Sequence, residues 1–156
     1  MNTYLLSLLL HIIGLSMMSG VVLAGFMANR RFWKVYASDR LRAAAILDLT
    51  ARFPIIMGVG MLLLLVSGIY MMALVHGTYG EQLWFRIKMG MVVLLVLNSV
   101  VGRRLGKKMR PVLLAVSSNE KIETSLEPIK GQLTLFYMIQ LLLLLAIFTC
   151  GVLKFT

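Results

Sequence analysis

The chain has 156 residues, 60% of them hydrophobic, and its mean hydropathy is +0.89. A water-soluble domain of this size does not need so much apolar surface, so this composition excludes one. The formal net charge of +10 comes from 16 Lys and Arg against 6 Asp and Glu. Because most of the basic residues gather in two connecting segments, we exclude nucleic acid as a partner and expect contact with anionic lipid headgroups.

Four stretches are long enough to cross a bilayer, which takes about 20 apolar residues. They lie near residues 4–28, 54–76, 84–102 and 132–153. Since helices satisfy their own backbone polar groups in hydrocarbon, the sequence predicts an all-α, integral membrane, up-down four-helix bundle forming one domain over residues 1–156. The first span has no basic residue before it, and "NRRFWK" stands where a cleavage site would, so we interpret it as a retained helix.

The basic residues predict how the bundle is oriented. Six Lys and Arg lie between the first and second spans, seven lie between the third and fourth, and three lie elsewhere. Cytoplasmic loops carry such an excess, so both connecting segments are expected in the cytoplasm and both termini on the outer, periplasmic side. The protein is therefore expected to be a multi-pass protein of the cytoplasmic (inner) membrane.

The first span carries small residues at four-residue steps: Ser16, Gly20, Ala24 and Ala28. Small side chains let two helices approach closely in a membrane. We interpret the stripe as a face for packing within the bundle, with a homo-oligomer contact as the alternative.

The segments that connect the spans also contain sequence patterns that predict local structure. "RRFWKVYASDRLRAAAILDLTARF" mixes apolar and basic residues at helical spacing and predicts a cytoplasmic or interfacial helix. Pro54 then opens the second span in its first turn. Residues 103–131 are expected to form an exposed segment, helical in part on either side of Pro111.

Three ionisable candidates stand out in the predicted spans: His11, Lys88 and, less deeply, His76. Such a group is unfavourable by about 2.5–3.5 kcal/mol near the bilayer centre, so it usually has a partner or a function. At 1.5 Å per residue, His11 lies roughly 27 Å and Lys88 roughly 22 Å from the inner boundary, which matches the two in height. His76 lies roughly 36 Å up, at or beyond the outer surface, and is a poorer match for His11.

The helix face around His11 carries Gly14, Met18, Val22 and Gly25 at three- and four-residue steps. We interpret the glycines as leaving room beside the imidazole for a large flat group such as a porphyrin, with Gly14 and Met18 lining it. Histidine binds iron through a neutral ring nitrogen, so His11 is a candidate haem ligand. The alternative is a structural histidine that hydrogen-bonds a neighbouring helix or a water.

Lys88 also has two interpretations. Its stem can lie in the hydrocarbon while its ammonium reaches the outer surface. Alternatively, the ammonium pairs with an anion such as a porphyrin propionate where the dielectric constant is low. In the second case Lys88 is a candidate catalytic and cofactor-binding residue together with His11.

The sequence gives weaker evidence for metal sites other than haem iron. Met72 and His76 lie four residues apart near the outer surface and suit Cu(I), whereas most of the twelve methionines are scattered through the spans. Cys150, the only cysteine, is expected to be an inert packed thiol. Asn98 and Gln140 are expected to tie helices together, with an interior polar track as the alternative; the same two interpretations apply to Tyr70, Tyr137 and Thr149. All six acidic residues lie outside the spans, which counts against a transporter.

Three motifs, taken in order, resemble a known family. They are "LHIIG" with His11, "RFPIIMGVGMLLLLVSGIY" with Pro54 and Gly68, and "WFRIKMGMVVLL" with Lys88. Over residues 1–105 the chain resembles the bacterial four-helix membrane protoporphyrinogen IX oxidases and the wider copper-resistance-D-like proteins. The resemblance implies haem b on His11, a lysine needed for activity at Lys88, and electrons passed from a porphyrin substrate to quinone. Where that family tends to carry a histidine late in its third helix, this chain has Asn98-Ser99.

Three functions therefore remain open. The leading hypothesis is a haem-associated redox membrane protein, an oxidoreductase of the protoporphyrinogen IX oxidase type. The second is a non-enzymatic accessory or assembly subunit that uses its small-residue stripe. The third is a small copper-handling protein or transporter.

Overall fold

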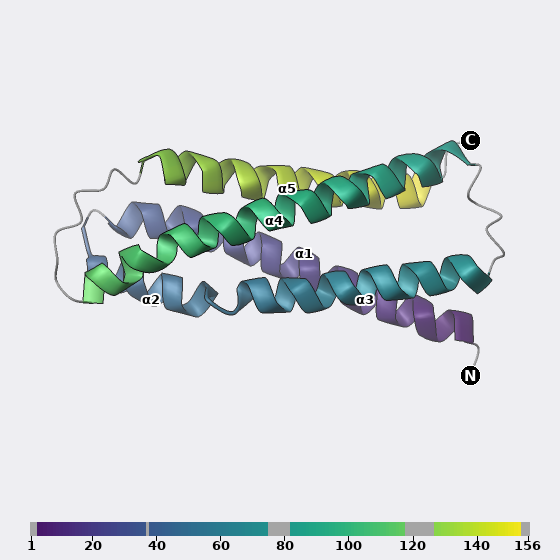
Figure 1. Ribbon diagram of the computed structural model, residues 1–156, viewed down its shortest axis with the longest axis horizontal. Helices are drawn as coiled ribbons and strands as arrows, with labels where there is room; N and C mark the ends of the chain where they lie inside the picture. The colour runs from purple at the N-terminus through teal and green to yellow at the C-terminus, as the bar shows by residue number, and fades with distance from the viewer. Residues whose placement is uncertain (1–2, 37, 75–81, 118–126, 154–156) are drawn as a thin grey trace.

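The computed structural model describes residues 3–36, 38–74, 82–117 and 127–153. The described residues fold almost entirely into helices; the four long helices run alternately up and down, and the short second helix runs in the same direction as the helix that follows it (Figure 1). These are α1 (Thr3–Tyr36), α2 (Arg40–Thr50), α3 (Phe53–Leu74), α4 (Leu83–Ser117) and α5 (Glu127–Leu153). The first and last described residues, Thr3 and Leu153, lie at one end, which we call the terminal end (Figure 1). We call the opposite end, where α1 meets α2, the basic end.

The predicted all-α class is confirmed, and so is the presence of four helical stretches that could span a membrane by length and composition. Four helical stretches are long and apolar enough to cross a membrane: Thr3–Tyr36, Arg40–Leu74, Leu83–Met109 and Pro128–Val152. The helices extend beyond the predicted spans, mostly at the basic end. With 34 residues, α1 is about 51 Å long, whereas a hydrocarbon core is about 30 Å thick. Similarly, α4 continues past Pro111 to Ser117.

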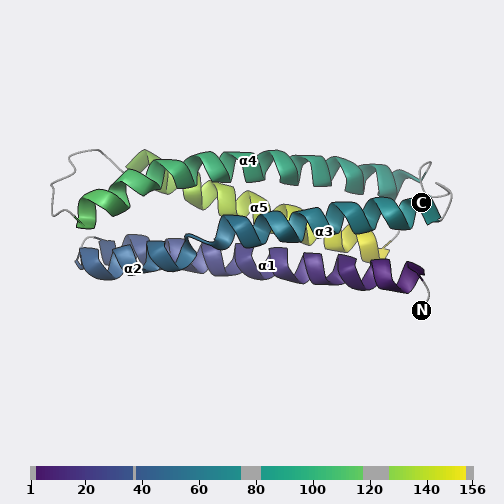
Figure 2. The same ribbon diagram turned by 60° about the horizontal axis from the view of Figure 1, so that its bottom comes forward.

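The segment expected to form a cytoplasmic or interfacial helix is divided, since its first residues continue α1 to Tyr36 and α2 forms most of the rest. Asp39 caps α2: its carboxylate accepts a hydrogen bond from the Arg42 backbone N–H at 3.0 Å, satisfying a donor that the first turn leaves free. Its two-residue connection to α3 ends where Pro54 occupies the second position of the new helix. Figure 2 shows α2 lying alongside the end of α1.

The helices are packed as two pairs. α1 packs along α3, and α4 packs along α5, while α1 also contacts α5 and thereby joins the pairs. α2 lies against α1 and α4. Within the described residues, no comparable packing joins α3 to α4, although they follow each other in the chain. The bundle is therefore closed on the α1–α5 side and loosely packed on the α3–α4 side.

Two clusters of buried apolar side chains hold the bundle together. The first lies at the basic end, where α1, α2, α4 and α5 meet, and comprises Phe32, Ala43, Leu105, Met109, Leu133 and Phe136. The second lies nearer the middle of the spans and comprises Met18, Val22, Leu95, Leu144 and Ile147. α3 contributes only partly buried side chains to both clusters, such as Met57.

Polar side chains join α4 to α5 inside the bundle. The fully buried Gln140 donates to the Ser99 hydroxyl at 3.2 Å and accepts from the Asn98 amide at 2.6 Å. The prediction that Asn98 and Gln140 tie helices together is therefore confirmed. It is wrong for Tyr70, which is exposed, and for Thr149, which is exposed and donates to the Leu145 carbonyl of its own helix.

The predicted packing role of the small-residue stripe is wrong for most of its members. Ser16, Gly20 and Ala24 are exposed, and a Cβ built on Gly20 has no described atom within 4 Å. Only Ala28 is half-buried. The inward face of α1 is offset from the stripe and consists of Ser7, Gly14, Met18, Val22, Gly25, Asn29 and Phe32. The stripe faces away from the bundle because these other residues contact α3 and α5.

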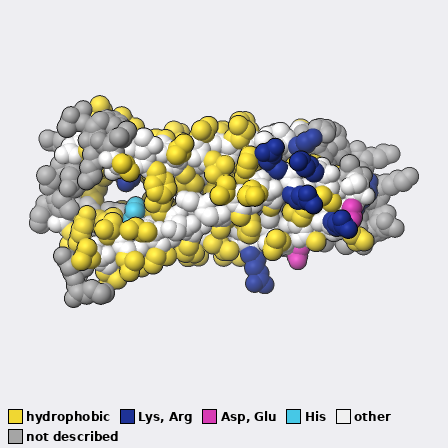
Figure 3. Space-filling view, turned by 180° about the vertical axis from the view of Figure 1, so that it is seen from behind, with side chains coloured by type: hydrophobic (Ala, Val, Ile, Leu, Met, Phe, Trp, Pro, Cys, Tyr) yellow, Lys and Arg dark blue, Asp and Glu magenta, His cyan; other side chains and the backbone are white. Residues whose placement is uncertain are grey.

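The described Lys and Arg side chains gather toward the basic end, and apolar side chains cover much of the remaining surface (Figure 3). This distribution is the one from which cytoplasmic loops were predicted. Both chain ends approach the terminal end, so they lie on the same side of any membrane that the bundle crosses. That this side is the periplasm stays a prediction.

Candidate functional site

His11 is held against α3 by a hydrogen bond with Ser67. Its Nδ1 lies 3.0 Å from the Ser67 Oγ, and the Ser67 hydroxyl itself donates to the Leu63 carbonyl one turn earlier. Because the single hydroxyl proton is used in that second bond, the Ser67 oxygen accepts from His11 Nδ1–H. A neutral imidazole then carries its free lone pair on Nε2. No partner for Nε2 occurs among the residues described.

Gly68 lets the imidazole lie close to α3. A Cβ built on Gly68 would lie 3.5 Å from His11 Cε1, which is ordinary van der Waals contact. A larger side chain would occupy the space that the ring uses. The structural alternative from the sequence, a histidine bonded to a neighbouring helix, is therefore confirmed in its geometry. It does not compete with ligation, because it engages Nδ1 and leaves Nε2 available.

Lys88 reaches inward from α4 toward the same region. Its side chain is half-buried, and its ammonium would lie 3.9 Å from a Cβ built on Gly151 near the end of α5. It is near enough to His11 for their charges to interact. Lys88, which the sequence matched with His11 in height, thus lies within electrostatic range of the imidazole.

The other two residues assigned to this site are occupied by helix packing. A Cβ on Gly14 would lie 2.8 Å from the Gly60 carbonyl oxygen and 3.0 Å from the Leu63 Cβ, so α3 fills the space beside it. Met18 is 0% exposed and belongs to the second apolar cluster. The expected open space for a flat group beside Gly14 is therefore wrong, because that glycine serves the close approach of α1 to α3.

The remaining metal candidates are not assembled into a site. His76 lies outside the described residues, while Met72 is partly exposed near the end of α3. Among the described residues, no three His, Cys, Asp or Glu side chains are grouped so that they could hold a metal ion. Asn98 and Ser99, which stand where the resembling family tends to carry a histidine, are bonded to Gln140 instead.

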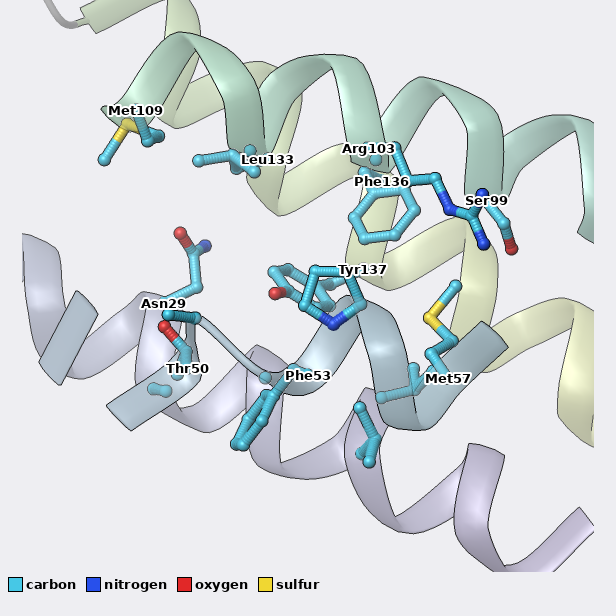
Figure 4. A pocket seen from close by; sticks show the side chains of 18 of the residues that line it. Asn29, Thr50, Phe53, Met57, Ser99, Arg103, Met109, Leu133, Phe136 and Tyr137 are labelled. Carbon is cyan, nitrogen blue, oxygen red and sulfur yellow. The ribbon is translucent and has the colours of Figure 1, made fainter. Parts of the chain in front are cut away.

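A cavity that the sequence analysis missed lies at the basic end. It has a volume of about 460 Å³ and is lined by all five helices (Figure 4). Its walls are mostly apolar, with a few polar groups: Asn29, Thr50, Ser99, Arg103, Lys107 and Tyr137. Among the glycines on its walls, Gly106 faces open space, whereas the space beside Gly102 is taken by the Phe136 ring of α5. The spacing of these glycines was the available signal, but glycine is common in membrane helices for other reasons.

No protein-family model, curated protein or solved structure matches this chain. The functional argument therefore depends on the geometry of its own side chains.

The donor set around His11 fits haem in part. It supplies one neutral imidazole with a free Nε2 and one nearby cation suited to a propionate. His11 is the one histidine in the described portion of the chain, so these residues would hold haem through a single imidazole. The group would have to approach from the Nε2 side of the ring, since α3 occupies the Nδ1 side.

Proposed function

We propose that the protein is a haem-associated redox membrane protein that binds haem b through His11 Nε2. The observation that supports this most directly is the hydrogen bond between His11 Nδ1 and Ser67. Histidines that ligate metals commonly donate their other ring N–H to a neighbouring acceptor, which fixes the tautomer and the ring orientation. Here Ser67 performs that role, and its own proton is directed away to Leu63.

Each residue around His11 has a defined task under this proposal. Ser67 keeps Nε2 unprotonated and orients the ring, while Gly68 allows the ring to lie against α3. Lys88 supplies positive charge for an anionic group of the cofactor in a region of low dielectric constant. Haem, when bound, would supply one-electron transfer. The resemblance of the sequence adds a porphyrinogen as the substrate and quinone as the electron acceptor.

The test is the absorption spectrum of the protein purified in detergent from cells that make haem. We expect a Soret band that is lost in His11→Ala. Ser67→Ala should keep the ligand but weaken haem affinity by about 10- to 100-fold, the usual effect of removing a hydrogen-bond partner from a metal-ligating histidine. Ser19→Ala is the matched control, because Ser19 donates only to a carbonyl of its own helix.

Two results would overturn the proposal. One is a colourless protein from haem-sufficient cells. The other is a Soret band that His11→Ala leaves unchanged in position and intensity. Loss of haem in Ser19→Ala to the same extent as in Ser67→Ala would show that the Ser67 effect is not specific.

A non-enzymatic accessory subunit is the second candidate, and one observation favours it. Ser16, Gly20 and Ala24 form an exposed small-residue surface on α1, where a helix of a partner protein or of a second copy could approach closely. Under this function, Gly20→Leu should abolish co-purification with the partner, whereas His11→Ala should not. The opposite pattern would exclude it.

A further inference from the structure

The cavity at the basic end lies on the loosely packed side of the bundle. It is lined by Met57 and Gly58 of α3 and by Gly102 and Gly106 of α4, the two helices between which no comparable packing occurs in the described residues. Arg103 reaches across this gap, since its guanidinium nitrogen would lie 3.1 Å from a Cβ built on Gly58. A molecule in the surrounding bilayer could therefore reach the cavity from the side.

The polar groups that remain free in the cavity are donors. Arg103 and Lys107 line it, and neither makes a hydrogen bond or ion pair with any residue in the described ranges. The Tyr137 hydroxyl also lacks a hydrogen-bond partner among them, and Figure 4 shows the Tyr137 ring in the middle of the lining residues. Among the residues that the structure describes, no acidic side chain lines the cavity.

Other polar atoms of the lining are already satisfied by the protein. Asn29 accepts from the Trp33 indole N–H at 3.0 Å, and the Thr50 hydroxyl donates to carbonyls of its own helix. The Ser99 hydroxyl is used by Leu95 and Gln140. The cavity thus combines apolar walls with unpaired cations at one side. Ligand pockets commonly have this form, apolar with a few convergent polar groups, and span about 300–1,000 Å³.

We propose that this cavity binds a membrane amphiphile that carries an acidic head group on an apolar body. The head group pairs with Arg103 and Lys107, because guanidinium binds carboxylate and phosphate through parallel hydrogen bonds. The apolar body lies against Met57, Met61 and Phe136. A phospholipid and a lipid-soluble carboxylic acid are both sources of this chemistry.

The site is separate from His11. Val21, the lining residue of α1 nearest to His11 in sequence, lies ten residues further on, or about 15 Å along the helix. Binding in the cavity consequently does not depend on the haem proposal, and His11→Ala should leave it intact.

Native mass spectrometry of the detergent-purified protein tests the proposal. The protein is titrated with phosphatidylglycerol and, separately, with phosphatidylcholine, which has the same apolar body but no net charge. We expect the anionic lipid to bind about tenfold more tightly, and Arg103→Gln to reduce its affinity by about tenfold. Arg104→Gln is the matched control, since Arg104 is adjacent and exposed but does not line the cavity.

A second variant fills the cavity without removing charge. A Cβ on Gly106 meets no described atom within 4 Å, so Gly106→Leu should extend into the cavity and lower the affinity for phosphatidylglycerol at least tenfold. Gly131→Leu is its control, because Gly131 has the same open surroundings outside the lining. Elution volume in size-exclusion chromatography and the circular dichroism spectrum show whether each variant is folded.

The mass of any molecule that co-purifies with the protein separates the two sources. A phospholipid or an acidic non-phospholipid amphiphile, lost in Arg103→Gln and kept in Arg104→Gln, would support the proposal. Equal affinity for the two lipids would overturn it. Unchanged binding of the anionic lipid in folded Arg103→Gln and Gly106→Leu would also overturn it.

Discussion

Replacing Gly14 by alanine should destabilise the contact between α1 and α3. The added Cβ would lie 2.8 Å from the Gly60 carbonyl oxygen, whereas ordinary contact begins at 3.4 Å, so the helices must separate locally by about 0.6 Å. The obstacle is backbone and cannot rotate away. Overpacking of this kind lowers stability by about 1–3 kcal/mol. We expect the upper part of that range, a fall of about 4–12 °C in Tm for a chain of this length.

Gly20→Ala is the matched control on the same helix. A Cβ at Gly20 meets no described atom within 4 Å. Both substitutions gain up to about 1 kcal/mol from the higher helix propensity of alanine, so the difference between their Tm values reports the steric term. Gly20→Ala should therefore be neutral or stabilising.

Thermal unfolding in detergent, followed by tryptophan fluorescence and circular dichroism, measures the difference. Gly60→Ala provides an independent check from the other helix, because its Cβ would lie 3.0 Å from the Gly14 carbonyl oxygen. The same loss is expected in protein without haem, since the contact is between two helices. Equal Tm values for Gly14→Ala and Gly20→Ala would refute the packing argument.

Three further perturbations probe other contacts. The first is a double-mutant cycle of unfolding free energies between Gln140→Leu and Asn98→Leu. We expect a coupling energy of about 0.6–1.7 kcal/mol, from the mean to the maximum found for hydrogen bonds between membrane helices. Additive effects of the two substitutions would contradict the hydrogen bond. Asp39→Ala should lower the free energy of unfolding by about 1 kcal/mol through the lost cap of α2; Asp39→Asn should not. Gly25→Ala, whose Cβ would lie 2.7 Å from the Tyr137 ring, should lower Tm, and Tyr137→Leu should restore it; without rescue, the clash is not the cause.

The spans could be predicted because hydrophobic length is a strong signal in a bilayer. Their ends could not, since α1 and α4 continue as helices beyond the hydrocarbon, where the residues are mixed in polarity. The direction in which each side chain points depends on the rotation of its helix. That rotation is set by packing, and four-residue spacing alone does not reveal it. For this reason the stripe containing Gly20 was assigned inward although it is exposed.

The candidate site was partly predictable for a related reason. Helical rise indicated that His11 and Lys88 lie at a similar height in the bilayer, and in the structure they are within electrostatic range of each other. Ser67 was missed because a serine inside a span gives no sign of which helix it faces. The role of Gly14 was misjudged because the sequence cannot distinguish a glycine that makes room for a ligand from one that admits a neighbouring backbone.

Because of its apolar cluster, the basic end should depend on temperature for its stability in a different way from the middle of the bundle. Phe32, Leu105 and Leu133 lie beside basic residues that belong in the headgroup region or in water. Water therefore drives the burial of this cluster, whereas the cluster around Met18 is surrounded by lipid and depends on close packing. Cooling weakens the first kind of association. The change in heat capacity on local unfolding should therefore differ between the two ends of the bundle. On cooling, the basic end should lose its packing first.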